Sequence, residues 1–196
     1  MKRYIDWGRE VLDGEIEAIR AVRDRLGVPF SDAVGLIKSC GGKVIVTGLG
    51  KSGHVGKKIA ASFASLGTPS FFLHSAEALH GDAGMIGNRD VLVAISNSGE
   101  TREVVATARL ARELGVRVIA MTGKPGSSLG KLADVWIDVA VEREADYLNL
   151  APTSSSTVTL AVGDALAVAA ARARGFQASD FASRHPGGSL GKKTRR

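Results

Sequence analysis

The chain has 196 residues, of which 44% are hydrophobic and 23% are charged, and it carries a formal net charge of +6. This length fits one globular domain, and the composition excludes disordered and collagen-like chains. The single cysteine, Cys40, excludes an internal disulfide. The first residues lack the apolar core of a signal peptide, and no uninterrupted apolar run reaches the roughly 18–20 residues of a membrane span. We therefore expect a cytoplasmic protein without a membrane partner.

The positive charge is concentrated at the end of the chain. Four of the six net charges belong to basic side chains within residues 192–196. We expect these residues to form a basic tail, and the small excess elsewhere gives little support for a nucleic-acid partner.

The first 40 residues predict two helices that pack on the domain. Leu12, Ile16 and Ile19 are spaced by three and four residues, which predicts an amphipathic helix over about residues 5–26. A shorter helix is expected after Pro29, and the Gly41-Gly42 pair ends it.

From residue 43 onward, short β-branched runs alternate with loops and helical stretches. Apolar strands joined by helices are typical of a parallel sheet covered on both faces. The fold class is therefore α/β, and we expect a three-layer α-β-α sandwich with a five-stranded parallel sheet in the flavodoxin-like order 2-1-3-4-5. A long helix is expected over about 153–174, with Gly175 at its end. The expected strands are residues 43–47, 69–73, 90–96, 116–122 and 134–140.

A glycine-rich loop, GLGKSG at residues 48–53, follows the first expected strand. It satisfies G-x-G-x-x-G, but the first acid after the second strand is Glu77, too late for a dinucleotide-binding fold. As a P-loop, its first glycine would fall on Ile45 inside the strand. An anion site remains, made of backbone N–H groups, Ser52 and Lys51 at a helix start. The alternative is a tight turn with a solvated lysine.

Two more hydroxyl-rich segments begin helices. SNSGET at 96–101 follows the third strand, and LAPTSSST at 150–157 follows the last. Both are also good helix caps, so a structural role stays open for each. The loops after strands one and three meet where the sheet order reverses, and we therefore predict a phosphate site there. The substrate-binding candidates in these three loops are Gly50, Ser52, Ser96, Ser98, Thr101, Thr153 and Ser154.

Together with GDALAVA and DFASRHPGGSLG, these motifs resemble the sugar isomerase (SIS) domain of D-arabinose-5-phosphate isomerases, over about residues 41–191. The resemblance implies a homotetramer that interconverts D-ribulose 5-phosphate and D-arabinose 5-phosphate. This reaction of carbohydrate metabolism begins Kdo and lipopolysaccharide biosynthesis. Many family members continue into two CBS domains, whereas this chain ends shortly after its His-Pro-Gly-Gly. A naturally short form and a truncated chain both fit this end, and we expect any regulation to act at or near the isomerase domain.

Aldose–ketose isomerisation moves a proton between C1 and C2 through a cis-enediol, and opening the aldose ring needs a second acid–base group. No metal or redox cofactor is required. The resemblance implies four catalytic positions: Lys51, Glu103, Glu144 and His185. We expect Glu144 to move the C1/C2 proton and His185 to assist ring opening, and the place of His185 far down the chain allows it to act across a subunit interface. Lys51 would steady the phosphate or enediolate, and Glu103 would orient or share the acid–base work.

Each acid–base candidate also has a structural interpretation: an acid favoured by a helix dipole for Glu103, a solvated loop for Glu144 and a helix end for His185. His80 is expected to hydrogen-bond a substrate hydroxyl or to support the site. A zinc site is not expected, because His54, His74, His80 and Asp82 lack a recognised ligand spacing. The alternative functions are another SIS phosphosugar isomerase, such as a 6-phospho-3-hexuloisomerase, and a non-catalytic phosphosugar sensor.

Overall fold

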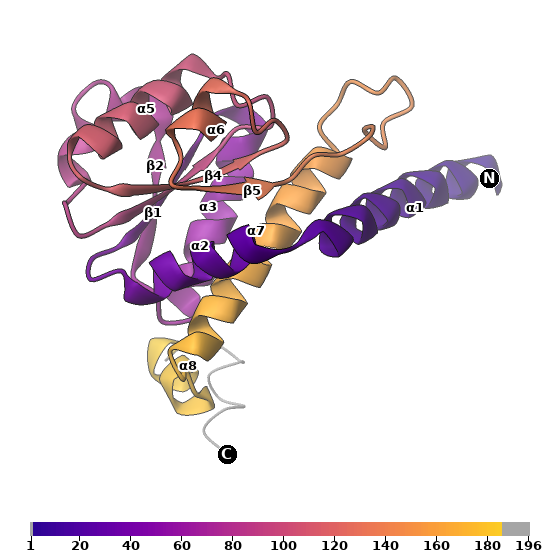
Figure 1. Cartoon of the computed structure of the whole chain (residues 1–196). Helices are drawn as coiled ribbons and strands as arrows, with labels where there is room; N and C mark the ends of the chain where they lie inside the picture. Colours follow the sequence, from indigo (N-terminus) through magenta and orange to yellow (C-terminus); the bar gives the residue numbers. More distant parts are fainter. Residues whose placement is uncertain (1, 186–196) are drawn as a thin grey trace.

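A five-stranded parallel sheet forms the middle layer of the protein, and helices cover both of its faces (Figure 1). The computed structural model describes residues 2–185. The strand order is β2-β1-β3-β4-β5, which confirms the predicted fold class and order. All five strands lie where the sequence predicts them. Their bounds are β1 Val44–Gly48, β2 Ser70–His74, β3 Val91–Ile95, β4 Arg117–Thr122 and β5 Val135–Asp138.

The central strands β1 and β3 are buried at every residue, because both faces of the sheet are covered. They pair in register from Val44 opposite Val91 to Gly48 opposite Ile95. The ends of these two strands therefore lie side by side, and so do the loops that follow them.

One face is covered by α3 (Gly50–Ser65) and α7 (Ser154–Ala173), with α1 (Lys2–Arg25) and α2 (Val28–Ser39) packed mainly on α7. The predicted helices at 5–26, after Pro29 and at 153–174 are thus confirmed. Helices α3 and α7 approach closely, since a Cβ atom added at Gly163 would lie 2.3 Å from Cδ1 of Ile59. Only glycine fits at this contact.

The other face is covered by α5 (Arg102–Glu113), with the short helices α4 (Ser75–Ala78), η1 (Asp82–Met85) and α6 (Ser128–Leu132). Val104, Ala108 and Ala111 of α5 are fully buried in the apolar cluster on this face. After α7, Gly175 has a φ of +72°, as predicted for a helix end, and α8 (Ala178–Arg184) follows.

Helix α7 is long and apolar enough to cross a membrane by length and composition, but 56% of its most apolar window is buried inside the protein. This burial is what a core helix requires. The predicted basic tail and residues 186–191 of the expected domain lie outside the described residues.

Two aspartates organise the amino edge of the sheet. Asp90 is buried, and its carboxylate accepts backbone hydrogen bonds from Lys43 at 2.7 Å and Gly87 at 2.8 Å. Asp134 accepts one from Val118 at 2.8 Å and pairs with Arg117. These carboxylates fix the turns that lead into the strands.

Candidate functional site

Three segments at the carboxyl edge of the sheet enclose a cleft of about 180 Å³. They are the loop after β1, the loop after β3 and the start of α7. This is the point where the strand order reverses, as the sequence predicts. The lining residues are Leu49, Lys51, Ser52, Val55, Asn97, Pro152, Ser155, Ser156 and Thr159.

The turn after β1 directs the start of α3 at this cleft. Gly50 has a φ of +58°, a conformation that glycine adopts readily, and Gly53 N donates to Leu49 O at 3.2 Å. A Cβ atom at Gly48 would lie 3.2 Å from Gly53 N, so the turn needs a small residue here. The first turn of α3 contains no acid. Its backbone N–H groups and the exposed Lys51 therefore favour an anion.

The loop after β3 uses part of its hydroxyl groups internally. Ser96 is buried, and its Oγ lies 2.9 Å from Oγ1 of Thr101 and accepts a hydrogen bond from Gly99 N at 3.1 Å. Ser98 is exposed and accepts one from Glu100 N at 3.2 Å. Ser96 and Thr101 thus shape the loop, whereas Asn97 lines the cleft.

Gly99 locks this loop against the one after β4. Its φ is +68°, and an added Cβ atom would lie 2.0 Å from Oγ of Ser127. Gly99 O also accepts a hydrogen bond from Leu129 N at 3.0 Å. The backbone of the predicted phosphate loop is therefore held in one conformation.

Glu144 caps the start of α7. Its Oε2 accepts hydrogen bonds from Thr153 N at 2.8 Å and Ser155 N at 3.0 Å, and the Ser155 hydroxyl donates to Oε1. Partial burial raises the pKa of Glu144, but these hydrogen bonds outweigh it and leave the pKa below its ordinary value. The side chain is therefore an ionised carboxylate at neutral pH, with both oxygens engaged.

The segment from Glu144 to Thr153 is internally cross-linked. Thr153 Oγ1 accepts a hydrogen bond from Ala145 N at 2.8 Å. Asp146 accepts from the backbone N–H groups of Leu150 and Ala151, both at 3.1 Å, and these bonds lower its pKa. The hydroxyl of Thr153 thus serves the loop, and Ser154, which is buried, does not line the cleft.

Glu103 and His80 lie at the same edge of the sheet, but neither lines the cleft. Glu103 is in the first turn of α5, and its carbonyl accepts a hydrogen bond from Thr107 Oγ1 at 2.8 Å. The same hydroxyl lies 3.2 Å from the carbonyl oxygen of Ser75, which ties α5 to α4. His80 is exposed just after α4.

His185 lies at the opposite edge of the sheet. Its ring stacks on Phe181 with 3.9 Å between centroids, and its Nε2 lies 2.9 Å from Oγ of Ser65. Ser65 ends helix α3, whereas Lys51 is at its beginning. At a rise of 1.5 Å per residue, roughly 20 Å separate the two ends. Within one chain, His185 therefore does not join Lys51.

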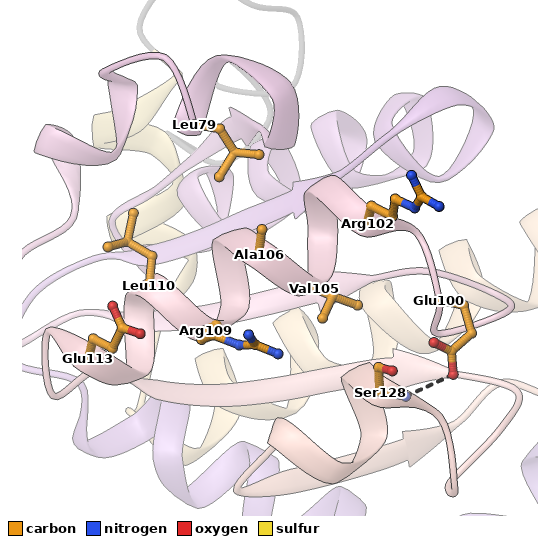
Figure 2. Close-up of a pocket in the computed structure, with 9 residues that line it drawn as sticks. All are labelled: Leu79, Glu100, Arg102, Val105, Ala106, Arg109, Leu110, Glu113 and Ser128. Atoms are coloured by element: carbon orange, nitrogen blue, oxygen red, sulfur yellow. Dashed lines mark hydrogen bonds between the residues drawn. The ribbon is translucent and has the colours of Figure 1, made fainter.

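A larger hollow of about 490 Å³ lies along the outer face of α5 and contains none of the predicted site residues. Figure 2 shows Arg102, Val105, Arg109 and Leu110 along that helix, with Glu100 accepting a hydrogen bond from Ser128 at its edge. The hollow does not combine the hydroxyl-rich helix starts that favour a phosphate.

Within residues 2–185, no three His, Cys, Asp or Glu side chains lie close enough to hold a metal ion. His54, His74, His80 and Asp82 are therefore not brought together as such a group. Buried Nδ1 of His74 has no hydrogen-bond partner in this part of the chain.

The sequence missed four polar residues of the cleft as site candidates: Asn97, Ser155, Ser156 and Thr159. Ser155 and Ser156 belong to the hydroxyl-rich run that predicted the site, and Thr159 lies one helical turn after Ser155. That spacing is the signal that would have found Thr159. No comparable signal distinguishes Asn97 from its neighbours.

Residues 36–169 match the family model described as the SIS domain. A protein of Pseudomonas aeruginosa named arabinose 5-phosphate isomerase KdsD is 53% identical over 190 residues, which is 97% of this chain and 58% of that protein. A protein of the same name from Escherichia coli is 53% identical over 186 residues, covering 95% of this chain and 57% of that protein. The chain thus spans little more than half the length of these relatives.

A solved structure from Escherichia coli CFT073, in complex with arabinose 5-phosphate, superposes with a TM-score of 0.91 and is 43% identical. The alignment covers 94% of this chain and 98% of that chain.

Proposed function

The chain belongs to the SIS-domain family, and from this premise we propose that it interconverts D-ribulose 5-phosphate and D-arabinose 5-phosphate. One observation carries the proposal: three polar loops converge on a cleft that is open to Lys51 and to the starts of two long helices. Two helix N-termini and a lysine favour the phosphate of such a substrate. Further support is the name of the relatives that are 53% identical, and the arabinose 5-phosphate complex of the 43% identical protein.

The phosphate is proposed to lie against the first turns of α3 and α7. Ser52 would donate a hydroxyl hydrogen bond there, and Lys51 would steady the phosphate or the enediolate. The hydroxyls of Ser155 and Ser156 donate to Glu144 and to the carbonyl oxygen of Thr153, so each would have to exchange that bond to donate to the phosphate. Six further residues are proposed to shape or contact this pocket: Gly50, Ser96, Ser98, Thr101, Thr153 and Ser154.

The C1/C2 proton transfer is assigned to Glu144, with Glu103 orienting the substrate or sharing the acid–base work and His80 binding a hydroxyl or supporting the site. To accept a proton, a Glu144 oxygen must exchange a capping hydrogen bond for the substrate, because both oxygens are engaged with Thr153 and Ser155. The reaction needs no metal or redox cofactor, since the enediol forms by proton transfer alone.

His185 is proposed to reach the cleft of a second copy and to assist ring opening there. Because His185 lies roughly 20 Å from Lys51 along α3, we assign this role to the cleft of a second subunit. The protein is accordingly proposed to be a homotetramer, and exposed apolar side chains such as Tyr4, Leu12 and Tyr147 support association. We place it in the cytoplasm, without membrane or nucleic-acid partners, at the first step of Kdo formation.

The test is incubation of the metal-stripped protein with ribulose 5-phosphate, followed by identification of the product. Arabinose 5-phosphate is expected. Turnover of a hexulose 6-phosphate but not of ribulose 5-phosphate would indicate the other SIS isomerase. Tight binding of ribulose 5-phosphate without turnover would indicate a sensor.

The role of Glu144 is tested separately by exchange of the C2 proton of arabinose 5-phosphate in D₂O. The Glu144→Gln variant is expected to lose exchange while it still binds arabinose 5-phosphate. Full exchange in this variant would remove Glu144 as the base. Glu142→Gln, which changes an exposed acid two residues away, is the matched control.

A further inference from the structure

We infer that the first two thirds of α1, residues 2–17, pair in antiparallel orientation with the same segment of a second copy. Figure 1 shows α1 projecting away from the body of the domain toward its N-terminus. Val22, near the other end, is its one buried residue among those described. Because isolated helices of this length are marginal in water, the projecting part of α1 favours a partner.

An apolar stripe marks the face that this partner would cover. We define the α1 stripe as Ile5, Leu12, Ile16 and Ile19, all of them exposed. Ile5 and Leu12 are 56% and 59% exposed. Within residues 2–17, Ile5 and Leu12 are seven residues apart and Ile16 follows one turn later, and Ile19 continues the seven-residue spacing just beyond this segment. This is the spacing at which one helix packs along another. The repeat therefore favours a helix as the occupant.

The distribution of charge along α1 favours a second copy of this chain as the partner and indicates the orientation of the pair. Residues 2–9 contain three basic side chains and one acid, whereas residues 10–17 contain four acids and no base. A parallel pair would place like charges together. In an antiparallel pair, the basic half of each segment faces the acidic half of the other, which is favourable twice.

Gly8 supports a close crossing of the two helices. It lies three residues after Ile5 and four before Leu12, on the same side of the helix. A Cβ atom added there would meet nothing within 4 Å in its own chain, so the domain itself does not require glycine. Glycine inside a helix costs about 1 kcal/mol relative to alanine. In an antiparallel pair centred near residue 10, Leu12 of each copy packs against Gly8 of the other.

This inference rests on the homo-oligomer proposed above and specifies its contact. The first test measures the mass of the full chain in solution by light scattering. Leu12→Asp is expected to weaken self-association at least about tenfold, because it places a charge in the apolar stripe. The control is Leu114→Asp, an exposed leucine at the end of α5. An oligomer unaffected by Leu12→Asp overturns the inference alone, and a monomeric wild-type chain overturns it together with the oligomer.

Gly8→Leu is a second test, because a solvent-exposed Gly8 and a Gly8 at a helix crossing predict different effects on association. Leucine raises helix propensity, so a solvent-exposed Gly8 predicts a more helical chain with unchanged association. A close crossing predicts weaker association at equal or higher helicity, measured by circular dichroism and sedimentation. Unchanged association overturns the crossing.

Direction is tested by charge reversal. Changing Lys2, Arg3 and Arg9 to Glu is expected to weaken association about tenfold, since acidic then faces acidic. Changing Glu10, Asp13 and Glu17 to Lys in the same chain is expected to restore it. A parallel pair keeps like charges together in all three chains and predicts neither result. Failure of the rescue overturns the antiparallel assignment.

Discussion

At the amino edge of the sheet, Asp90 is 5% exposed and spends both carboxylate oxygens on the backbone N–H groups of Lys43 and Gly87. At the carboxyl edge, Lys51 and Asn97 instead present their side chains to an open cleft. Both edges are rich in polar groups. The difference is that Asp90 is satisfied within the chain, whereas the side chains of Lys51 and Asn97 are exposed at the cleft.

This contrast predicts opposite responses to mutation, and Lys51→Met should give the largest. Its value of kcat/KM is expected to fall about 10²–10³-fold through loss of a charge that stabilises phosphate or enediolate. The free energy of unfolding should change by less than about 0.5 kcal/mol, because the side chain is exposed. Lys57→Met, on the same helix outside the cleft, is the control. Equal losses of activity in both variants would contradict a special role for Lys51.

Asp90→Ala should show the reverse behaviour. Two backbone N–H groups lose a charged acceptor, and the free energy of unfolding is expected to fall by about 3 kcal/mol, measured by urea denaturation. The kcat of the folded fraction should remain that of the wild type. Asp32→Ala, an exposed acid of α2, controls for loss of charge. A loss of kcat at full folding would break the contrast between the edges.

Glu144 combines a proposed role in the reaction with a structural role as the cap of α7. Its substitution should change stability less than that of Asp90. Glu144→Gln is expected to cost about 1 kcal/mol at pH 7, since it weakens the cap of α7. The folded-state pKa of Glu144 is lowered from 4.5, so its contribution is present above that pH and is lost as the pH falls through the folded value. The gap in unfolding free energy between wild type and variant should therefore close in acid. A gap that is independent of pH would contradict the cap.

Ser98→Ala should have the smallest effect. The hydroxyl is exposed and accepts one hydrogen bond, from Glu100 N, so stability is expected to change by less than about 0.5 kcal/mol. KM for ribulose 5-phosphate is expected to rise a few-fold if Ser98 contacts the phosphate. An unchanged KM would assign Ser98 to the loop alone.

The sequence predicted the sheet well because its five apolar runs are short, β-branched and separated by helical stretches. It also predicted the cleft, since the order of parallel strands determines which loops meet. It did not predict which hydroxyl groups line that cleft. Ser96 and Thr101 bond each other away from the cleft, while Ser156 and Thr159 line it although their hydroxyls donate to carbonyl oxygens of their own segment. These choices depend on hydrogen bonds within folded loops, which spacing alone does not reveal.

The position of His185 in the fold could not be predicted from the sequence for a different reason. The sequence contains no direct information on which edge of the sheet a segment reaches after the last long helix. The length of α7 decides this, because twenty residues carry the chain from the carboxyl edge to the amino edge before α8 begins.

The contact between Gly163 and Ile59 has a consequence for the cleft. Because the Ile59 side chain of α3 packs directly on Gly163 of α7 and fills the place of a side chain there, the packing resists sliding of the two helices past each other. The two helix starts that face the cleft are therefore held at a fixed separation before any ligand arrives. An anion of matching size would bind with little structural reorganisation, and a larger one would have to strain the core of the protein.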